Sequence, residues 1–275
     1  MPQSLILTTC WYPVGAKFGH SVYETWIDNI LSTVVNYKLV VYTDQECFQR
    51  WSQVYSCCPN LHFVMYPLEE FELYRKMGVD FWIHNHNRNN CVNSLVHWKV
   101  NLIWCQKVWL VERTAQMCWF GENAQETWYG WVDIGYFRCR LGMDVPKQKL
   151  VEIPAQGCLE RLDQAKIHYL LVNRNDKEVN RLKEIVARGL FLPDNQISFG
   201  GGCFLLYGDL QATRWREMFD DMFQHYVECG HVVKDDQVVV STCIFREWTR
   251  VFEIHRPPNN YPFDPWFYMT AVLLQ

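Results

Sequence analysis

The sequence has no long run of apolar residues and no block of like charge. No stretch approaches the roughly 18 consecutive apolar residues of a transmembrane helix, so we expect no membrane span. The first residues, MPQSLILTTCWYP, lack the basic region of a secretory signal. Lysine and arginine total 26 against 30 aspartate and glutamate, a formal net charge of −4. Without clustered basic residues, we do not expect a protein that binds nucleic acid.

The chain has twelve cysteines, but no pair of them has the C-x-x-C spacing of a zinc or redox site. With no secretory signal, this usage predicts reduced cysteines that mostly act as small buried hydrophobic side chains. We therefore expect a reducing, cytoplasmic compartment. Peripheral contact with a membrane is left open, because Trp266, Phe267 and Tyr268 could serve it, although packing against the core is the favoured interpretation.

The sequence does contain ample material for a hydrophobic core. Of 275 residues, 49% are apolar and 20% are charged, which excludes a disordered chain and suits one large α/β domain. Aromatic residues make up 16% of the chain. The flat faces of tryptophan and tyrosine suit sugars and nucleobases as well as a protein core.

The order of the predicted elements indicates an α/β fold with a mostly parallel sheet. In the first half, helices separate runs that are apolar on both faces of a strand, the pattern of a parallel sheet covered on both sides. Ligands of such sheets bind beyond the carboxyl ends of the strands, where Thr8, Thr9 and Asp44 are expected. The predicted strands span residues 5–9, 38–43, 62–66, 128–138, 167–172, 196–208 and 251–255, and the predicted helices 21–36, 93–114, 176–190, 209–230 and 235–248.

One lysine of the predicted helix 93–114 falls on its apolar side. Lys99 lies between leucine and isoleucine positions at helical spacing rather than among the polar ones. In one interpretation its stem is buried and its ammonium reaches water, which is the commoner arrangement. In the other, the ammonium stands at the edge of a cleft and binds an anion such as a diphosphate.

The segment 128–138, WYGWVDIGYFR, places an acid and then a glycine in an aromatic strand. Asp133 is costly to bury in such a run unless it is paired, hydrogen-bonded or bound to a metal. Gly135 either allows a ligand to approach the backbone closely or marks a bulge. This is the most informative local pattern in the chain.

Two further patterns follow in the second half. Gly200, Gly201 and Gly202 are flanked by strand-like residues, so the backbone there must lie close to a ligand or bend sharply, with a ligand favoured. Asp235 and Asp236 stand at the predicted start of a helix, where the helix dipole accounts for one carboxylate. The helix dipole does not account for the second carboxylate. In such a pair, one carboxylate can act as an ionised base while the other is its hydrogen-bonding partner.

The order of these features resembles the core of GT-A-type nucleotide-sugar glycosyltransferases: acid on a middle strand, glycine loop, acid pair at a helix start, late histidine. The phrases WVDIGYFR, FGGGCFLLYG and KDDQ are most similar to the HtrL/YibB-type glycosyltransferase-like family, and the resemblance runs from the LILTT strand to about His255. It implies a single GT-A-like domain in which residues 1–137 bind a nucleotide sugar and residues 138–275 shape the acceptor site. It also implies transfer of a sugar, from a UDP-linked donor by preference, to a hydroxyl of a glycan or glycoconjugate.

The resemblance implies that one group of residues binds the nucleotide sugar. Thr8, Thr9 and Asp44 would line the nucleoside pocket. Asp133 matches the first acid of the D-x-D signature, which contacts ribose and the metal-bound diphosphate. Lys99 lies on the helix before that strand, where a cation can meet phosphate.

A second group is implied to take part in sugar transfer. Gly200 to Gly202 match the loop beneath the donor sugar and the acceptor. The acid pair matches the motif from which inverting members draw their base, so Asp236 is the predicted base and Asp235 its partner or alternative. His255 matches the late histidine that binds metal or diphosphate in several members.

The chain departs from the family pattern at one position, because Gly135 stands where the signature has its second acid. A divalent ion such as Mn²⁺ or Mg²⁺ could still be held by Asp133, His255, the diphosphate and waters. Alternatively, Lys99 and His255 could neutralise the leaving diphosphate without a metal. The sequence leaves metal dependence open.

Two alternatives to a glycosyltransferase are considered. The first is a non-catalytic nucleotide- or glycan-binding protein that retains the fold, and the D-I-G departure is its best support. The second is a metal-dependent phosphohydrolase built on Asp133, Asp235 and Asp236, which lacks histidines in register with those acids. The one H-x-H motif, His84 to His86, lies in an Asn-rich segment that we interpret as a solvated or mobile loop.

Overall fold

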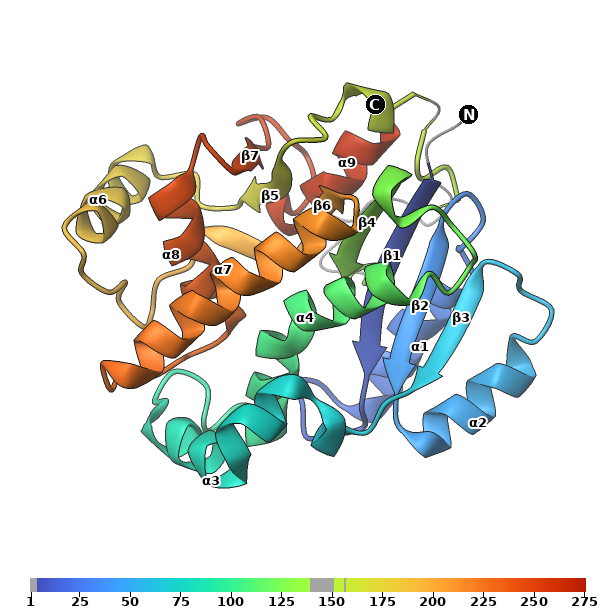
Figure 1. Ribbon diagram of the computed structural model, residues 1–275, viewed down its shortest axis with the longest axis horizontal. Coiled ribbons are helices and arrows are strands. Elements are labelled where there is room, and N and C mark those ends of the chain that lie inside the picture. The colour runs from blue at the N-terminus through green and yellow to red at the C-terminus, as the bar shows by residue number, and fades with distance from the viewer. Residues whose placement is uncertain (1–3, 139–150, 156) are drawn as a thin grey trace.

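The computed structural model describes residues 4–138, 151–155 and 157–275. Across these residues, seven strands form one sheet in the order β3-β2-β1-β4-β6-β5-β7 (Figure 1). Neighbouring strands are parallel except that β6 runs antiparallel to both β4 and β5. The strands are β1 (Ser4–Trp11), β2 (Lys38–Thr43), β3 (Leu61–Met65), β4 (Thr127–Val132), β5 (Ile167–Leu171), β6 (Phe199–Tyr207) and β7 (Phe252–His255).

Helices cover both faces of the sheet. One hydrophobic cluster packs α3, α4, α6, α7 and α8 against one face, and a second packs α1, α2 and α9 against the other. None of the helices in the described part of the chain combines the length and apolar character needed to cross a membrane. The helices are α1 (His20–Leu31), α2 (Gln45–Val54), α3 (Glu72–Arg88), α4 (Trp98–Met117), α6 (Asp176–Ala187), α7 (Asp209–Glu228), α8 (Asp236–Glu247) and α9 (Tyr268–Leu274).

The predicted α/β class, with a mostly parallel central sheet covered by helices on both faces, is confirmed. All seven predicted strands exist, with boundaries that shift by a few residues. Three helices, α2, α3 and α9, were not predicted. The segment 84–90, expected to be a solvated or mobile loop, is instead the last turn of α3 and the residues after it, and Asn85 and Asn89 are buried there.

The aromatic residues near the C-terminus pack on the core, as favoured from the sequence. Phe267 is buried, Trp266 packs over Gly200, and Tyr268 packs edge-on against Tyr261. Eleven of the twelve cysteines lie in the described part of the chain and none of these forms a disulfide, whereas Cys139 lies outside it.

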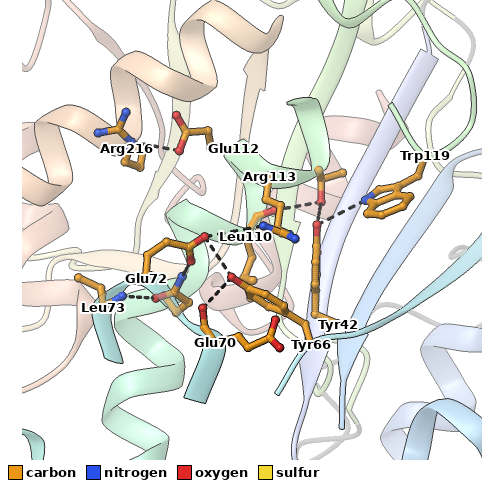
Figure 2. Close-up of polar contacts among 12 residues, drawn as sticks. Tyr42, Tyr66, Glu70, Glu72, Leu73, Leu110, Glu112, Arg113, Trp119 and Arg216 are labelled. Carbon is orange, nitrogen blue, oxygen red and sulfur yellow. Dashed lines mark hydrogen bonds and ion pairs between the residues drawn. The ribbon is translucent and has the colours of Figure 1, made fainter. Parts of the chain in front are cut away.

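A polar network fixes α4 against the start of α3 (Figure 2). The Tyr66 hydroxyl donates to Glu72 Oε1 at 3.1 Å, and Gln106 Nε2 donates to the other oxygen of the same carboxylate. The backbone N–H of Leu73 in turn donates to Gln106 Oε1 at 3.2 Å, and Arg113 Nη1 lies 3.9 Å from Glu72. Because Gln106 and Arg113 both belong to α4, this network sets where α4 lies on the sheet.

Gly130 in the centre of β4 should not tolerate a side chain. A Cβ atom there would lie 2.3 Å from the Phe204 carbonyl oxygen and 2.7 Å from Leu205 Cδ2. Because backbone of the paired strand cannot move aside cheaply, we expect Gly130→Ala to lower the free energy of unfolding by about 1–3 kcal/mol in urea denaturation. Gly15→Ala is the control, because its Cβ would meet only His97 Cβ at 3.5 Å. Equal losses of stability in the two variants would contradict this packing.

Candidate functional site

A buried lysine in the middle of α4 joins two carboxylates and a main-chain carbonyl. Lys107 Nζ lies 3.0 Å from Asp133 Oδ1 and 3.0 Å from Asp236 Oδ2. It also donates to the carbonyl oxygen of Gly201 at 2.9 Å. The lysine side chain is only 6% exposed. Four segments that are distant in sequence therefore meet at one ammonium group: α4, the turn after β4, β6 and the start of α8.

Asp133 is the member of this cluster that faces solvent. It follows β4 directly, and its backbone N–H donates to the Gly202 carbonyl at 2.8 Å. Its Oδ1 accepts a hydrogen bond from Trp131 Nε1 at 2.7 Å in addition to its contact with Lys107. The side chain is 36% exposed. Asp133 thus lies at the carboxyl end of a parallel strand, where ligands of open α/β sheets bind.

The two acids at the start of α8 have different partners. Asp235 caps the helix, since its Oδ1 accepts from the backbone N–H of Gln237 at 3.1 Å, and its Oδ2 lies 3.2 Å from Lys234 Nζ. Asp236 instead pairs with Lys107, and its side chain is 5% exposed. The structure therefore separates a capping carboxylate from a surplus one, as the sequence pattern indicated.

Asparagines clamp the loop that presents these acids. The side-chain amides of Asn85 and Asn101 both donate to the Val233 main-chain carbonyl, at 2.8 and 2.9 Å, and Asn85 Oδ1 accepts from the Val233 N–H. Asn89 donates to the Lys234 carbonyl at 2.9 Å. The Asn-rich segment that we interpreted as a solvated loop thus holds the acidic loop in place, because its amides satisfy buried backbone groups.

The three consecutive glycines make room for side chains of the protein itself. A Cβ on Gly201 would lie 2.7 Å from Asp236 Oδ2, and one on Gly200 would lie 3.1 Å from Val172 Cγ1. Gly202 is less crowded, with Asp133 Oδ2 at 3.4 Å from the position of its Cβ. Close approach was predicted here, but at Gly201 it is the buried carboxylate that approaches.

Gly135 is covered by an aromatic ring. A Cβ at this position would lie 2.8 Å from Cε3 of Trp26. The ring of Trp26 also lies 5.5 Å from the guanidinium carbon of Arg138. A carboxylate side chain therefore cannot take the place of Gly135 unless Trp26 moves.

The cluster shifts the pKa values of its members. Burial raises the pKa of Asp236 to about 7, although Lys107 opposes the shift. Burial disfavours the charged form of Lys107, but Asp133 and Asp236 outweigh it and hold the pKa of the lysine above its ordinary value. The ammonium is therefore charged at neutral pH, while Asp236 has the pKa of a group that can exchange a proton there.

Several charged side chains of this region act on Lys17. Burial lowers the pKa of Lys17, the negative charge of Asp235 opposes the shift, and the positive charges of Lys234, Arg138 and Lys107 add to it. Lys107 pairs with Asp133 and Asp236, and Lys234 pairs with Asp235. Lys17 is therefore a further basic group near these ion pairs.

The predicted nucleoside-pocket residues lie in different settings. β1 continues to Trp11, so Thr8 and Thr9 are inside the strand and fully buried rather than at its carboxyl end, which corrects the predicted boundary. Thr8 Oγ1 donates to Thr114 Oγ1 of α4 at 2.9 Å. Asp44 does follow β2 as expected, and there it caps α2 by accepting from the backbone N–H of Cys47 at 2.9 Å.

Lys99 and His255 do not lie with the acids. Lys99 is in the first turn of α4, with its ammonium 5.7 Å from the ring centre of Trp98. His255 ends β7, which is three strands from β4, about 14 Å at the usual strand spacing. The structure thus brings together Asp133, Gly201, Gly202, Asp235 and Asp236, and it adds Lys107.

Lys107 could have been found by the test that selected Lys99. Ile103 lies four positions before Lys107, and Leu110 and Val111 lie three and four positions after it, so the lysine falls on an apolar stripe. Because α4 begins at Trp98, Lys107 is in its middle and cannot reach water around the helix end. A buried lysine in that position requires carboxylate partners.

Removing the ammonium should destabilise the fold. Lys107→Met leaves Asp133 and Asp236 without their common cation, and we expect a loss of about 3–5 kcal/mol in the free energy of unfolding. Adding Asp236→Asn should recover part of the loss, because one unpaired carboxylate is then removed. Lys76→Met, which breaks a half-exposed pair with Asp220, is the control and should cost no more than about 1 kcal/mol. Urea denaturation compares the variants, and a Lys107→Met loss no larger than the control would contradict the cluster.

Asp236 should also make stability depend on pH. Burial raises the pKa of the Asp236 carboxyl from 3.8 to about 7 in the folded chain. Below pH 3.8 the carboxyl is protonated in both the folded and the unfolded chain. As the pH rises from there to about 7, it ionises more readily in the unfolded chain, so the folded state loses stability. We expect the free energy of unfolding of Asp236→Asn, relative to the unsubstituted chain, to increase by a few kcal/mol between about pH 4 and 7 and then level off. Denaturation at a series of pH values measures this, and a difference that is flat or falls with pH would be contrary to it.

No protein-family model and no curated protein matches the sequence. Solved structures do match, and one of them is core-mannan synthase A (CmsA/Ktr4) from Aspergillus fumigatus in its Mn/GDP form. It is 12% identical with a TM-score of 0.41, and the match covers 92% of this chain and 72% of that chain. A likeness of this size is no argument for a shared activity, and the HtrL/YibB-type resemblance stays a prediction.

Proposed function

We propose that the chain is a glycosyltransferase that moves a sugar from a nucleotide-sugar donor, UDP-linked by preference, to a hydroxyl of a glycan or glycoconjugate. The observation that carries the proposal is the cluster in which Lys107 bridges Asp133 and Asp236 at the carboxyl end of β4. One carboxylate there is exposed and the other has a pKa near neutrality. The UDP preference comes from the sequence resemblance.

The basic groups around the site supply what a diphosphate leaving group needs. Glycosyl transfer separates charge as the bond to the diphosphate breaks, and fixed cations stabilise that charge. Lys17 and Arg138, whose charges act together with that of Lys107, are the groups we assign to the diphosphate. Asp44, at the carboxyl end of β2, is assigned to the nucleoside, in keeping with residues 1–137 as the donor-binding half and residues 138–275 as the acceptor-binding half.

A divalent ion, Mn²⁺ or Mg²⁺, would find one protein ligand at this site among the residues that the structure describes. Asp133 Oδ1 is engaged by Trp131 and Lys107, so Oδ2 is the oxygen left for a metal. Gly135 offers no carboxylate and His255 is three strands away. Mg²⁺ is commonly held by one or two carboxylates together with substrate phosphates. A bound ion would add positive charge at the diphosphate, and Asp133 would hold it.

Asp236 is the group we assign as general base, with transfer by inversion of the anomeric carbon. A base works best when its pKa is near the working pH, and burial gives the Asp236 carboxyl a pKa of about 7. Lys107 Nζ, 3.0 Å away, stabilises the ionised form that accepts the proton of the acceptor hydroxyl. Asp235 acts as a positioning residue, because it caps α8 and so fixes its neighbour.

The second candidate is a nucleotide- or glycan-binding protein without turnover. The observation that favours it is the ring of Trp26 over Gly135, which removes the space that a second metal-binding acid would need. A protein of this kind would bind the nucleotide but leave a nucleotide sugar intact.

A nucleotide panel followed by a release assay distinguishes these functions. We expect UDP, rather than GDP, CMP or dTDP, to raise the melting temperature, by an amount that reaches about 2.7 kcal/mol of added stability at 100 times the Kd. Each nucleotide is tested with Mn²⁺ and with EDTA. UDP release from UDP-glucose, UDP-galactose and UDP-xylose then measures turnover. Stabilisation without release would support the binding protein, and no stabilisation by any nucleotide would overturn both.

Two asparagine variants test the residue roles. Asp236→Asn should keep the stabilisation by UDP and lower UDP release by at least about a hundredfold, the usual effect of a lost general base. Asp133→Asn should weaken the stabilisation by UDP, because Asp133 is the exposed carboxylate of the cluster, at 36%. Asp28→Asn on the exposed side of α1 is the control and should behave like the unsubstituted chain. Unchanged release in Asp236→Asn would exclude it as the base.

A further inference from the structure

We propose that His168, Glu253 and His255 form a zinc site, separate from the carboxylate cluster, that joins the edge strand β7 to β5. The three residues offer one ligand atom each, and these atoms all lie within 4.8 Å of one another. His168 Nδ1 lies 2.9 Å from His255 Nε2 and 3.5 Å from Glu253 Oε2. Two imidazoles and a carboxylate, with water in the fourth position, make a common zinc ligand set.

The strand register places these side chains on one face of the sheet. Glu253 and His255 are two residues apart on β7, so both point to the same side. β5 is parallel to β7, with His168 opposite Glu253 and Leu170 opposite His255. All three ligands therefore belong to two neighbouring strands at the end of the sheet (Figure 1).

The distances suit a tetrahedral ion. Zn–N bonds of about 2.0–2.1 Å place two tetrahedral ligands roughly 3.3 Å apart. The two measured separations from His168 Nδ1, 2.9 and 3.5 Å, lie on either side of this value. Glu253 is 42% exposed, so its carboxylate can turn toward the ion at little cost.

The surroundings of His168 fix the ring in the form that binds metal. Its Nε2 lies 3.0 Å from the carbonyl oxygen of Asp163, so Nε2 carries the proton and Nδ1 offers a lone pair. A carbonyl or carboxylate behind a ligating histidine is the usual outer-shell arrangement.

Solvent can reach the site from one side. Glu253 and Asp163 are among the residues that line a cavity of about 470 Å³, whereas His168 is fully buried. An ion that enters there would cross-link β7, which has a neighbour on one side only, to the interior of the sheet. The site would therefore add stability to the end of the chain whatever the chemistry of the carboxylate cluster.

The test uses the full chain freed of metal by a chelator. Zn²⁺ titrated by calorimetry should bind tightly at one ion per chain, and Co²⁺ should give the visible absorption of a tetrahedral site with nitrogen and oxygen ligands. Mn²⁺ should bind far more weakly, as the usual affinity order requires. Zn²⁺ should also raise the melting temperature.

Matched variants locate the ion. His255→Ala and Glu253→Gln should each weaken Zn²⁺ binding, by at least about a hundredfold for the histidine, and should abolish the rise in melting temperature. His97→Ala, at the start of α4, is the control and should bind as the unsubstituted chain does. The proposal is overturned if no tight Zn²⁺ binds, if His255→Ala binds Zn²⁺ normally, or if the Co²⁺ spectrum shows thiolate ligands.

Discussion

A charged ammonium buried in the middle of α4 constrains much of this structure. The side chain of Lys107 is 6% exposed, and a lysine so placed is tolerated only if its charge is paired and its protons find acceptors. It meets this requirement with Asp133, Asp236 and the Gly201 carbonyl, one partner for each of its three protons. The glycine at position 201 follows from this, because a side chain there would collide with the Asp236 carboxylate. The position of α4 is set at the residue before this lysine, where Gln106 is bound to the start of α3.

The sequence predicts the strands well because a strand that is buried on both faces is a continuous run of apolar residues. Such a run can be recognised without knowing which distant residues pack against it. It predicts α3 poorly, because its last turns are polar and their asparagines bind backbone groups of a loop almost 150 positions away. Asp133 and Asp236 stood out as acids without an evident partner, whereas the lysine that pairs them was overlooked in favour of Lys99. The partners of His255 could not be predicted at all, since they depend on the register between β5 and β7.

Asp133 and Asp236 differ in exposure, and this difference indicates which of the two carboxylates a ligand can contact. Asp133, at 36% exposed, is the one that a ligand can touch without rearrangement, whereas Asp236 is almost fully covered. Both share one cation, so any change of charge at Asp133 is felt at Asp236 through Lys107. When an anionic ligand or a metal arrives at the exposed carboxylate, the proton affinity of the buried one must change with it.

Under the proposed function, the ligands that Asp133 can offer decide the order of binding. Its Oδ1 is engaged by Trp131 and Lys107, so in the described part of the site it offers a divalent cation one carboxylate oxygen, which is a weak site. A diphosphate would supply the further oxygen ligands that such an ion requires. If the chain transfers a sugar as proposed, we therefore expect the nucleotide to recruit the metal, rather than a resident metal to recruit the nucleotide.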